Sequence, residues 1–525
     1  SYDGAISAGP PMIARRRPYP CAPFARHALF AAVASLMLAA CGPARDDGVV
    51  DVAIVGSDEG MRAPGLRLPF AAQHLRAATA QGLVRLDATG LVVPGIAERW
   101  IVTDDGASYI FRIREFDLPG GGRLTAQAVR DSLRRTVARL EGTSLGLDLE
   151  RVRDIRAMTG RVVEIRLDRP MPELLQLLAQ PELGLAVGDA PLGPMQIVDP
   201  GEDGDSEPLE GIYLAAMPPE LRGLPSQPDW DEGVEPVRLV ATDAAAAVEG
   251  FSRGVYDVVL GGSIVDFPLA EVGPLSRGTI RLGGVAGLFG LDIRNRTGFL
   301  ATAENREALI MAIDRPGLIE PFGVGGWTPS ERIVPLALPS QTAAEIIDAG
   351  TPSWSTLDLE QRRAQAASRV AAYAGSAESG QVTLRIGMPQ GPGADLLYSA
   401  LESQFAAIGV ASVRVGMDDE PDLAFRERIA RYGGAQWFLN QFDCTVSRAV
   451  CSEDVDFLLD LARDAPTAAE QASYLAEAEA ALVALSVYIP FGPPIRWSMV
   501  RGGVAGFADN PWGLHPLFPL SGAPI

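Results

Sequence analysis

The sequence predicts an α/β protein with more than one domain. In the second half of the chain, residues 357–374 and 394–408 are typical of amphipathic helices, and residues 381–388 and 411–417 are typical of strands, so the two kinds of element alternate. The chain has 525 residues, whereas a single hydrophobic core stops growing at roughly 250–300 residues. Two or three domains are therefore expected.

The amino-terminal segment is typical of a secreted lipoprotein. Residues 1–11 are interpreted as an expression remnant, because the first methionine is Met12. Four arginines and the apolar run 29–40 follow, and the run ends in Leu-Ala-Ala-Cys at Cys41. About a dozen apolar residues are too few to span a bilayer, which disfavours a transmembrane helix. We predict that 1–41 comprise this remnant and a signal peptide ending at Cys41, whose lipid tethers the exported protein to a membrane.

The charge balance narrows the classes of partner. The chain has 66 acidic and 45 basic residues, a net charge of −21, and every basic residue is an arginine. Removing residues 1–40, which contain Asp3 and four arginines, leaves 65 acidic and 41 basic residues, a net charge of −24. Such an acidic protein is a poor candidate for binding nucleic acid or anionic lipid headgroups. The charge of a ligand does not follow, because a cleft and the outer surface can differ in sign.

The cysteines predict one disulfide. Cys21 lies in the leader and Cys41 takes the lipid, so Cys444 and Cys451 remain. In an oxidising compartment two such cysteines are most simply joined. Closing so short a loop contributes roughly 2–3 kcal/mol in the chain-entropy model. Metal binding by this pair is disfavoured, because no cluster of other ligands accompanies it.

Residues 82–137 contain the clearest local pattern, a β-rich unit followed by a helix. Tyr109, Phe111 and Ile113 occupy alternate positions, which is the period of a half-buried strand. Turns that contain glycine flank this strand. Thr125 is placed to cap a helix whose apolar positions recur at helical spacing.

The same block resembles a known family. Its Pro-Gly turn, its Asp-Gly turn with the following Phe-Arg-Ile-Arg strand, and its Leu-Thr-Ala helix start are similar to those of extracellular solute-binding proteins of peptide/nickel-type ABC importers. This is family 5, which includes lipoproteins like the oligopeptide-binding protein. The matching residues are Pro94, Gly95, Ala97, Glu98, Trp100, Asp105, Gly106, Phe111, Arg114, Leu124, Thr125, Ala126, Val129, Ser132 and Arg135.

The resemblance implies a periplasmic-binding-protein-like fold, with two lobes joined by two crossovers. Lobe I is expected to comprise residues 48–283 and 494–525, with an extra subdomain at about 88–190, and lobe II residues 284–493. A solute would lie between the lobes and favour their closure about a hinge. The resemblance also implies a periplasmic monomer that delivers a peptide or other small molecule to an ABC permease.

The remaining elements follow from local patterns. Short β-branched runs favour strands, and apolar residues three or four positions apart favour helices. We expect strands at 51–55, 161–167, 237–240 and 290–295, helices at 69–84, 170–179, 243–250, 304–314 and 468–487, and a surface excursion rich in proline, glycine and acidic residues at 199–231.

The stretch 437–445 contains the candidate ligand contacts. Peptide-binding relatives carry an aromatic-x-x-Asp turn at this point, in which the carboxylate forms a charge-assisted hydrogen bond with the α-ammonium of the peptide. Here Asn440 stands three residues after Trp437, and Asp443 is out of register. A buried ammonium without a carboxylate carries a large desolvation penalty. The departure therefore disfavours a peptide with a free amino terminus as the ligand.

The candidate ligand-binding residues include aromatic side chains that offer apolar contact. An aromatic residue near a strand end belongs to the hydrophobic core about as often as it contacts a ligand. The candidates are Trp437, Asn440, Phe442, Asp443 and the loop residue Trp327.

A serine hydrolase is the enzyme alternative. Residues 142–146 have the G-x-S-x-G form around Ser144, but this string follows a helix, and the only downstream histidine is His515 in a proline-rich tail. The sequence contains no phosphate-binding loop and no metal-ligand cluster. We therefore expect no catalytic residue, metal or cofactor.

The predicted function is that of a lipid-anchored periplasmic solute-binding protein. It would deliver a peptide-like or other small solute to an ABC transporter for transmembrane transport. The alternative within binding proteins is a periplasmic module that serves a receptor or an outer-membrane system without an importer.

Overall fold

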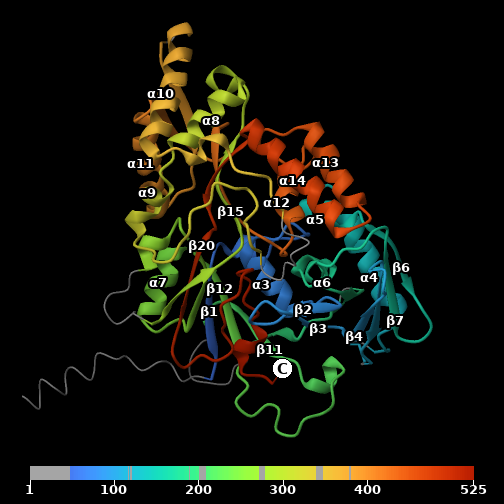
Figure 1. Cartoon of the computed structure of the whole chain (residues 1–525). Helices are drawn as coiled ribbons and strands as arrows, with labels where there is room; N and C mark the ends of the chain where they lie inside the picture. Colours follow the sequence, from blue (N-terminus) through green and yellow to red (C-terminus); the bar gives the residue numbers. More distant parts are fainter. Residues whose placement is uncertain are drawn as a thin grey trace, which may run out of the picture. The chain divides into compact units, whose positions relative to one another are not determined.

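A computed structural model of the chain describes residues 48–115, 117–118, 121–188, 190–199, 209–270, 278–338, 347–377 and 380–524 (Figure 1). The predictions for residues 1–41, including the signal peptide and the lipid on Cys41, lie outside the described residues.

The larger sheet has seven strands and is built around β1 (Val50–Val55). This strand pairs in parallel with a neighbour on each side, and Val52, Ala53 and Ile54 are fully buried, as the apolar run predicts. In sheet order the strands are β10 (Met195–Val198), β11 (Ile212–Ala216), β12 (Val237–Thr242), β1, β13 (Val258–Ser263), β20 (Ile495–Val500) and β14 (Ile280–Gly284).

A second sheet has five strands. Val285 and Ala286 separate β14 from its strand β15, and Pro493 and Pro494 separate its strand β19 from β20, so the chain passes between the two sheets at these points. In sheet order the strands are β17 (Val410–Val415), β16 (Val382–Gly387), β18 (Leu423–Ile429), β15 (Gly287–Ile293) and β19 (Tyr488–Gly492).

A third, antiparallel sheet of four strands contains the block with the family resemblance. Tyr109, Phe111 and Ile113 are buried on one face of its strand β5, which confirms the alternating pattern. The Thr125 hydroxyl accepts the Ala128 N–H, which confirms the cap of α4 (Ala126–Arg139). The sheet order is β4 (Ala97–Val102), β5 (Ser108–Ile113), β7 (Val162–Leu167) and β6 (Val152–Ala157), and two small hairpins join β2 (Val84–Leu86) to β3 (Val92–Pro94) and β8 (Ala186–Val187) to β9 (Ala190–Pro191).

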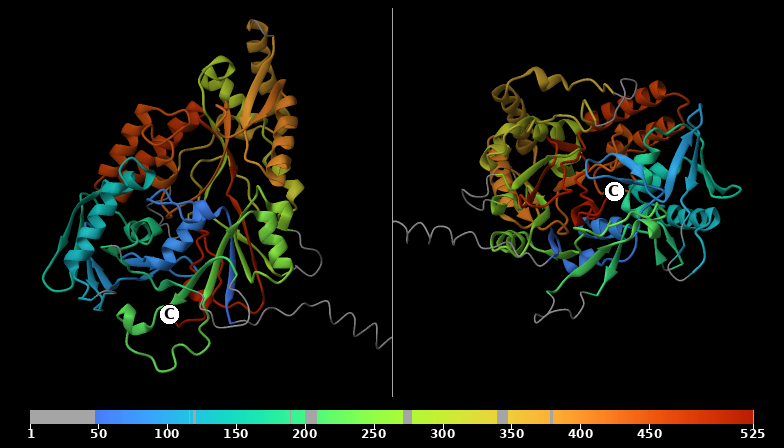
Figure 2. Two further views of the ribbon diagram at one scale, coloured as in Figure 1. Left: turned by 180° about the vertical axis from the view of Figure 1, so that it is seen from behind. Right: turned by 90° about the horizontal axis from the view of Figure 1, so that it is seen from below.

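The helices fall into groups that follow the sheets. In Figures 1 and 2, α12, α13 and α14 lie beside α5 and the four-stranded sheet, whereas α8, α10 and α11 lie with the five-stranded sheet. The other α-helices are α2 (Asp58–Met61), α3 (Phe70–Thr79), α5 (Ser144–Leu149), α6 (Leu174–Leu178), α7 (Ala244–Ser252), α8 (Ala303–Ala312), α9 (Arg315–Ile319), α10 (Leu359–Ser376), α11 (Pro392–Ala406), α12 (Ala435–Asn440), α13 (Glu453–Asp464) and α14 (Ala468–Leu485). Short 3-10 turns are η1 (Pro181–Leu183), η2 (Pro219–Arg222), η3 (Phe267–Ala270), η5 (Gly298–Ala301), η6 (Glu320–Phe322), η7 (Ser353–Thr356) and η8 (Phe518–Ser521).

Two predicted segments are wrong in extent. The helix expected at 69–84 ends at Thr79, and β2 begins at its far end. Gly82 there packs so closely that a Cβ atom would lie 2.5 Å from the Leu178 carbonyl oxygen. The surface excursion expected at 199–231 contains β11, an inner strand of the seven-stranded sheet, whose apolar alternation is short and surrounded by proline and glycine.

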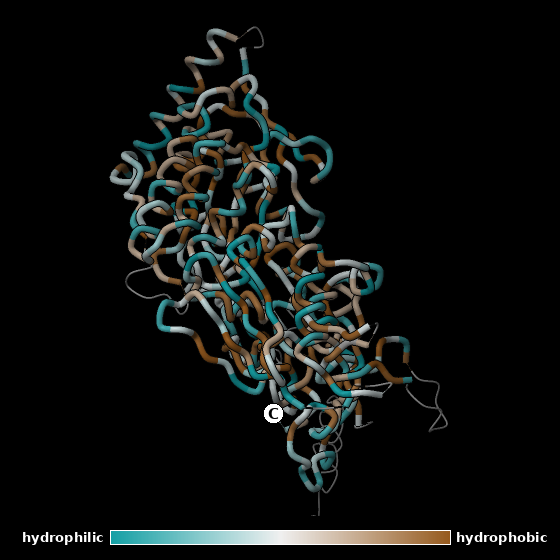
Figure 3. Tube along the Cα trace, turned by 90° about the vertical axis from the view of Figure 1, so that its right-hand side faces the viewer, coloured by the Kyte–Doolittle hydropathy of each residue, from teal (hydrophilic) through white to brown (hydrophobic). Residues whose placement is uncertain are grey.

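The hydrophobic clusters show which sheets share a core. Hydropathy alternates along most of the chain (Figure 3), because most elements bury one face only. One continuous hydrophobic cluster includes side chains of both the four-stranded and the five-stranded sheet, whereas the two faces of the seven-stranded sheet have clusters of their own. Among the described residues, no helix is both long and apolar enough to cross a membrane.

Candidate functional site

A cavity of about 440 Å³ lies where distant parts of the chain meet. Its walls come from the segment between α2 and α3, the turn between α4 and α5 with the start of α5, Glu182 of η1, the end of β18 with Arg431, and Val446. Arg428 is the lining residue that belongs to a sheet, so a solute in the cavity would touch the five-stranded sheet and the segments that face it. The lining residues are Leu66, Arg67, Leu68, Pro69, Leu140, Gly142, Thr143, Ser144, Leu145, Glu182, Arg428, Arg431 and Val446.

Arg428 is brought to the cavity by the pairing of β18 with β15. It stands opposite Leu288, and the neighbouring Gly287 packs against its backbone, because a Cβ atom there would lie 2.2 Å from the Arg428 carbonyl oxygen. At the cavity the Arg428 guanidinium donates a hydrogen bond to the Ser144 hydroxyl over 3.2 Å. A residue of the five-stranded sheet therefore contacts one that is 284 positions earlier in the chain.

Arg428 keeps its charge at neutral pH. Burial, followed by the positive charges of Arg426 and Arg431, lowers its pKa to about 10. Arg428 is exposed to solvent within the cavity, but protein atoms surround it closely enough to lower its pKa. Among the described residues it forms no ion pair with a carboxylate.

Arg431, which also lines the cavity, is fully engaged by the opposite wall. Its guanidinium donates to Gln73 Oε1 over 2.8 Å and to Gln180 Oε1 over 3.3 Å, and it pairs with Glu182 over 2.7 Å. Its carbonyl oxygen accepts a further bond from the Gln180 amide over 2.7 Å. Glu182 is only 2% exposed, so the pair is largely buried in the cavity wall. These contacts fix the turn after β18 against α3 and η1.

Ser144 has no arrangement suited to nucleophilic catalysis. Thr143 caps α5 through the Gly146 N–H, and Ser144 begins this helix with its hydroxyl bonded to Arg428. The two histidines in the described part of the chain lie elsewhere, where the His515 N–H donates to His74 Nε2. No base therefore contacts the serine among the described residues, and the hydrolase alternative has no geometric support.

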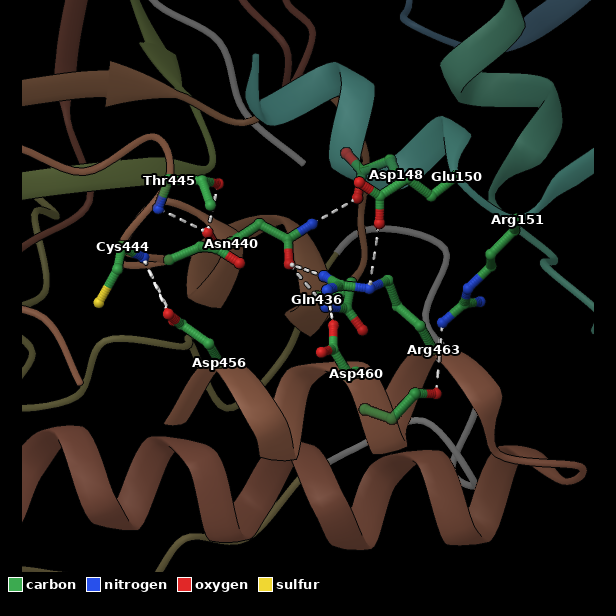
Figure 4. A network of polar contacts seen from close by, with 12 residues as sticks. Asp148, Glu150, Arg151, Gln436, Asn440, Cys444, Thr445, Asp456, Asp460 and Arg463 are labelled. Atoms are coloured by element: carbon green, nitrogen blue, oxygen red, sulfur yellow. Dashed lines mark hydrogen bonds and ion pairs between the residues drawn. The ribbon is translucent and has the colours of Figure 1, made fainter. Parts of the chain in front are cut away.

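One turn further along α5, a buried polar network joins the same two sides of the molecule (Figure 4). Asp148, 2% exposed, accepts the Tyr432 hydroxyl over 2.6 Å and the Asn440 amide over 2.7 Å, both on its Oδ1 atom. Its Oδ2 atom has no hydrogen-bond partner among the residues that the structure describes. Burial raises the pKa of Asp148 to about 7, although Tyr432 and nearby arginines oppose the shift. This carboxyl group is therefore poised to change charge near neutral pH.

The network continues into α12 and α13. The Gln436 amide donates to Asn440 Oδ1 over 2.6 Å, and Arg463 reaches the same oxygen at 3.5 Å while pairing with Asp460 (Figure 4). Arg151 donates to the Ala462 carbonyl oxygen over 3.4 Å. These bonds attach α12 and α13 to the segment that carries α5.

The five residues predicted as ligand contacts occupy different settings. Trp437 and Phe442 are 1% and 0% exposed, and their rings pack edge-on against Phe438 and Tyr488, respectively. Asn440 belongs to the Asp148 network. As ligand contacts these residues remain predictions, and the arrangement seen here gives them packing and bridging roles.

The other two predicted contacts are held by local hydrogen bonds. Asp443 accepts the Thr445 N–H over 2.9 Å and the Thr445 hydroxyl, which forms a tight turn. The Trp327 indole donates to the Pro493 carbonyl oxygen over 2.9 Å, beside the passage from β19 to β20. Neither residue lines the 440 Å³ cavity, and as ligand contacts both remain predictions.

The predicted disulfide between Cys444 and Cys451 is present, with Cα atoms 5.3 Å apart. The Cys444 N–H donates to the Asp456 carboxylate. Burial and the nearby charge of Asp443 raise the pKa of Asp456 to about 6. Val446, inside the disulfide loop, lines the cavity, so the loop is part of its wall.

A larger cavity of about 870 Å³ lies beside the start of β15. Its lining is mostly apolar and includes Val285, Arg315, Pro329, Leu336 and Pro493. Leu338 and Thr351 also line it, and between them residues 339–346 are not described. We therefore do not propose it as the solute site. In the described part of the chain, no group of three or more histidine, cysteine or acidic side chains is placed to hold a metal ion.

Arg67, Ser144, Arg428 and Arg431 line the cavity and were not among the predicted ligand contacts. Arg428 and Arg431 lie at the end of a strand, which is the signal in the sequence that could have pointed to them.

Comparisons with known proteins agree with this architecture. No protein-family model matches the chain. The probable deoxycholate-binding periplasmic protein YgiS of Escherichia coli (strain K12) is 28% identical over 129 residues, which are 20% of this chain and 23% of that protein. The match therefore spans about a quarter of that relative.

Solved structures match over nearly the whole chain. Haemophilus influenzae OppA in complex with RPPGFSPFR has a TM-score of 0.74 at 17% identity, with coverage of 90% of this chain and 99% of that one. The murein tripeptide-binding protein MppA of Escherichia coli has a TM-score of 0.71 at 16% identity, covering 90% and 98%. AgaA from Agrobacterium tumefaciens R10, in complex with agropinic acid, has a TM-score of 0.65 at 19% identity, covering 90% and 97%. The chain has the fold of these periplasmic binding proteins, which confirms the predicted fold class.

Proposed function

We propose that this chain is a periplasmic solute-binding protein that encloses a small solute in the 440 Å³ cavity and delivers it to an ABC importer. The observation that carries the proposal is a cavity walled on one side by residues 66–69, the α4–α5 turn and Glu182, and on the other by β18, the turn after it and the disulfide loop. The fold shared with OppA, MppA and AgaA over 90% of the chain supports it. In this role the protein has no enzymatic step, and Ser144 is a binding residue.

The proposal includes two lobes and a hinge. Lobe I comprises residues 48–283 and 494–525, and lobe II residues 284–493, so that Val285–Ala286 and Pro493–Pro494 are the crossovers. Ligand contact with Ser144 on one side and Arg428 on the other would favour the closed state over the open one. The Arg431–Glu182 pair and the Asp148 network are then closing contacts between the lobes.

The partners in this proposal are a solute, a permease and a membrane. The neighbours OppA and AgaA were solved with a peptide and with agropinic acid, which supports a peptide-like or other small organic solute here. The lipid on Cys41 would hold the protein, as a monomer, near the permease. A role in a receptor or outer-membrane system without an importer is the alternative for the same binding step.

The test combines native mass spectrometry with small-angle X-ray scattering. The protein, purified without a denaturing step, should carry a small molecule that is released on unfolding. Removal of this molecule should increase the radius of gyration, and its return should reverse the change. A chain that carries no solute and keeps one radius of gyration under all conditions would contradict the proposal.

A further inference from the structure

The cavity carries a net positive charge in a strongly acidic protein. Three arginines, Arg67, Arg428 and Arg431, line it, against the single carboxylate of Glu182. One oxygen of Glu182 pairs with Arg431, and the other is buried and has no hydrogen-bond partner in the described part of the chain. The charge that a solute meets in the cavity is therefore that of the arginines. Because the chain has a net charge of −21, this sign is local to the cavity.

The three arginines are not equally available. Arg431 is neutralised by Glu182 and bonded to two glutamine side chains. Arg67 is exposed and has no ion pair among the described residues. Arg428 uses one N–H donor, toward the neutral Ser144 hydroxyl. A guanidinium has five donors in a planar fork that matches a carboxylate, so Arg428 can accept such a partner without losing an existing ion pair.

Six of the thirteen lining residues are apolar, and Thr143 adds a hydroxyl group next to Ser144. The apolar side chains offer no hydrogen bonds, so they favour a solute that has an apolar part beside its polar group. The apolar lining residues are Leu66, Leu68, Pro69, Leu140, Leu145 and Val446.

We propose that the solute is an organic carboxylate with an apolar body, and that Arg428, together with the Ser144 hydroxyl, binds its carboxylate group. The inference rests on the proposed solute-binding function and specifies its substrate class. Arg67 adds a second exposed cation at the cavity wall. The ammonium of a peptide would face Arg428 and meet repulsion instead of a counter-charge.

Isothermal titration calorimetry with matched probes tests the charge requirement. The probes are 4-phenylbutyrate, its neutral amide 4-phenylbutanamide, the cation 4-phenylbutylammonium, and deoxycholate as a larger carboxylate. Inorganic phosphate is the probe for an anion without an apolar body. The two carboxylates should bind, whereas the amide, the ammonium and phosphate should bind at least about tenfold more weakly.

Variants then assign the contact. Arg428→Gln should weaken binding of the carboxylates by at least about tenfold and abolish the preference for a carboxylate over the amide. Arg428→Lys should retain part of this preference, because a lysine keeps the positive charge. Ser144→Ala should have a smaller effect of the same sign. Arg153→Gln, which removes an exposed arginine 3.9 Å from Asp168 on the surface, is the matched control and should bind normally. Circular dichroism confirms that each variant is folded.

Three outcomes would overturn the inference. The first is equal or tighter binding of the amide, the ammonium or phosphate. The second is carboxylate binding that Arg428→Gln leaves unchanged. The third is absence of binding by every carboxylate probe at about 1 mM. Mass spectrometry of the released solute separates this inference from the proposed function: a cationic or neutral solute refutes the carboxylate assignment alone, whereas a protein that carries and binds nothing refutes both.

Discussion

Arg428 and Arg431 line the same cavity three residues apart, yet the structure uses them differently. Arg431 pairs with a buried glutamate and bonds to Gln73 and Gln180, so its charge holds two parts of the molecule together. Arg428 has one bond to a neutral hydroxyl. The difference teaches that a cation in a binding site is available to a solute only when the protein has not already neutralised it.

Two buried carboxylates show the same contrast. Glu182 is held by the guanidinium of Arg431, whereas Asp148 is held by the neutral donors of Tyr432 and Asn440. Without a directly bonded cation, the buried Asp148 has its pKa raised to about 7. An ion pair fixes a charge, and neutral donors leave the group able to titrate.

The largest expected effect comes from breaking the ion pair. Arg431→Gln leaves the Glu182 carboxylate buried without a counter-charge, so the free energy of unfolding should fall by about 3–5 kcal/mol. Urea denaturation followed by circular dichroism measures it. Arg153→Gln, at the surface, should change stability by less than about 0.5 kcal/mol. Equal losses in the two variants would show that Arg431 is not a structural cation.

The next effect concerns the titration of Asp148. Its pKa is raised from 3.8 to about 7, so the folded state binds a proton that the unfolded state has released. Between these two values its contribution to stability falls as the pH rises, and the full penalty is present above the higher value. Asp148→Asn removes this slope. As the pH rises from about 4 to about 8, the free energy of unfolding of the variant should increase by about 2–4 kcal/mol relative to that of the unmodified protein.

Thermal and urea denaturation across this pH range measure the slope. Asp58→Asn, at an exposed carboxylate paired with Arg62, should leave the pH profile unchanged. If Asp148→Asn has the same profile as the unmodified protein, Asp148 does not titrate near neutral pH.

Much of the fold followed from the sequence because the signals are local. The alternation of Tyr109, Phe111 and Ile113 requires only a strand with one buried face, and Thr125 caps a helix three residues ahead of its N–H partner. β11 was missed because its five residues stand among turn residues, and only the neighbouring strands of the sheet stabilise it.

The site could not be predicted in the same way. Its arginines and Ser144 are far apart in the chain, and an isolated arginine at a strand end is equally typical of a solvated surface. Among the predicted ligand contacts, Trp437 and Phe442 are aromatic, and both are buried in the hydrophobic core. Which arginine is paired and which is free depends on Glu182, and this pairing exists only in the folded chain.

A smaller loss should follow from Tyr432→Phe. The substitution keeps the buried ring and removes the hydroxyl that donates to Asp148 over 2.6 Å. Stability should fall by about 1–2 kcal/mol, more at pH 8 than at pH 5, because the ionised carboxylate is the stronger acceptor. Urea denaturation at both pH values measures this. Tyr213→Phe, whose hydroxyl bonds the exposed Leu209 carbonyl oxygen over 3.1 Å, is the control. A loss that does not depend on pH would assign the effect to packing alone.

The smallest effect is expected at Arg428, and it completes the comparison of the two arginines. Arg428→Gln removes one hydrogen bond to Ser144, but it also removes a charge that Arg426 and Arg431 disfavour. Because these two changes oppose each other, the free energy of unfolding without solute should stay within about 0.5 kcal/mol of the unmodified value. Salt should narrow the remaining difference, since it screens repulsion between cations at the cavity. Urea denaturation at low and high ionic strength measures both. A loss as large as that of Arg431→Gln would make Arg428 a structural residue, and the distinction between a neutralised and an available cation would then fail.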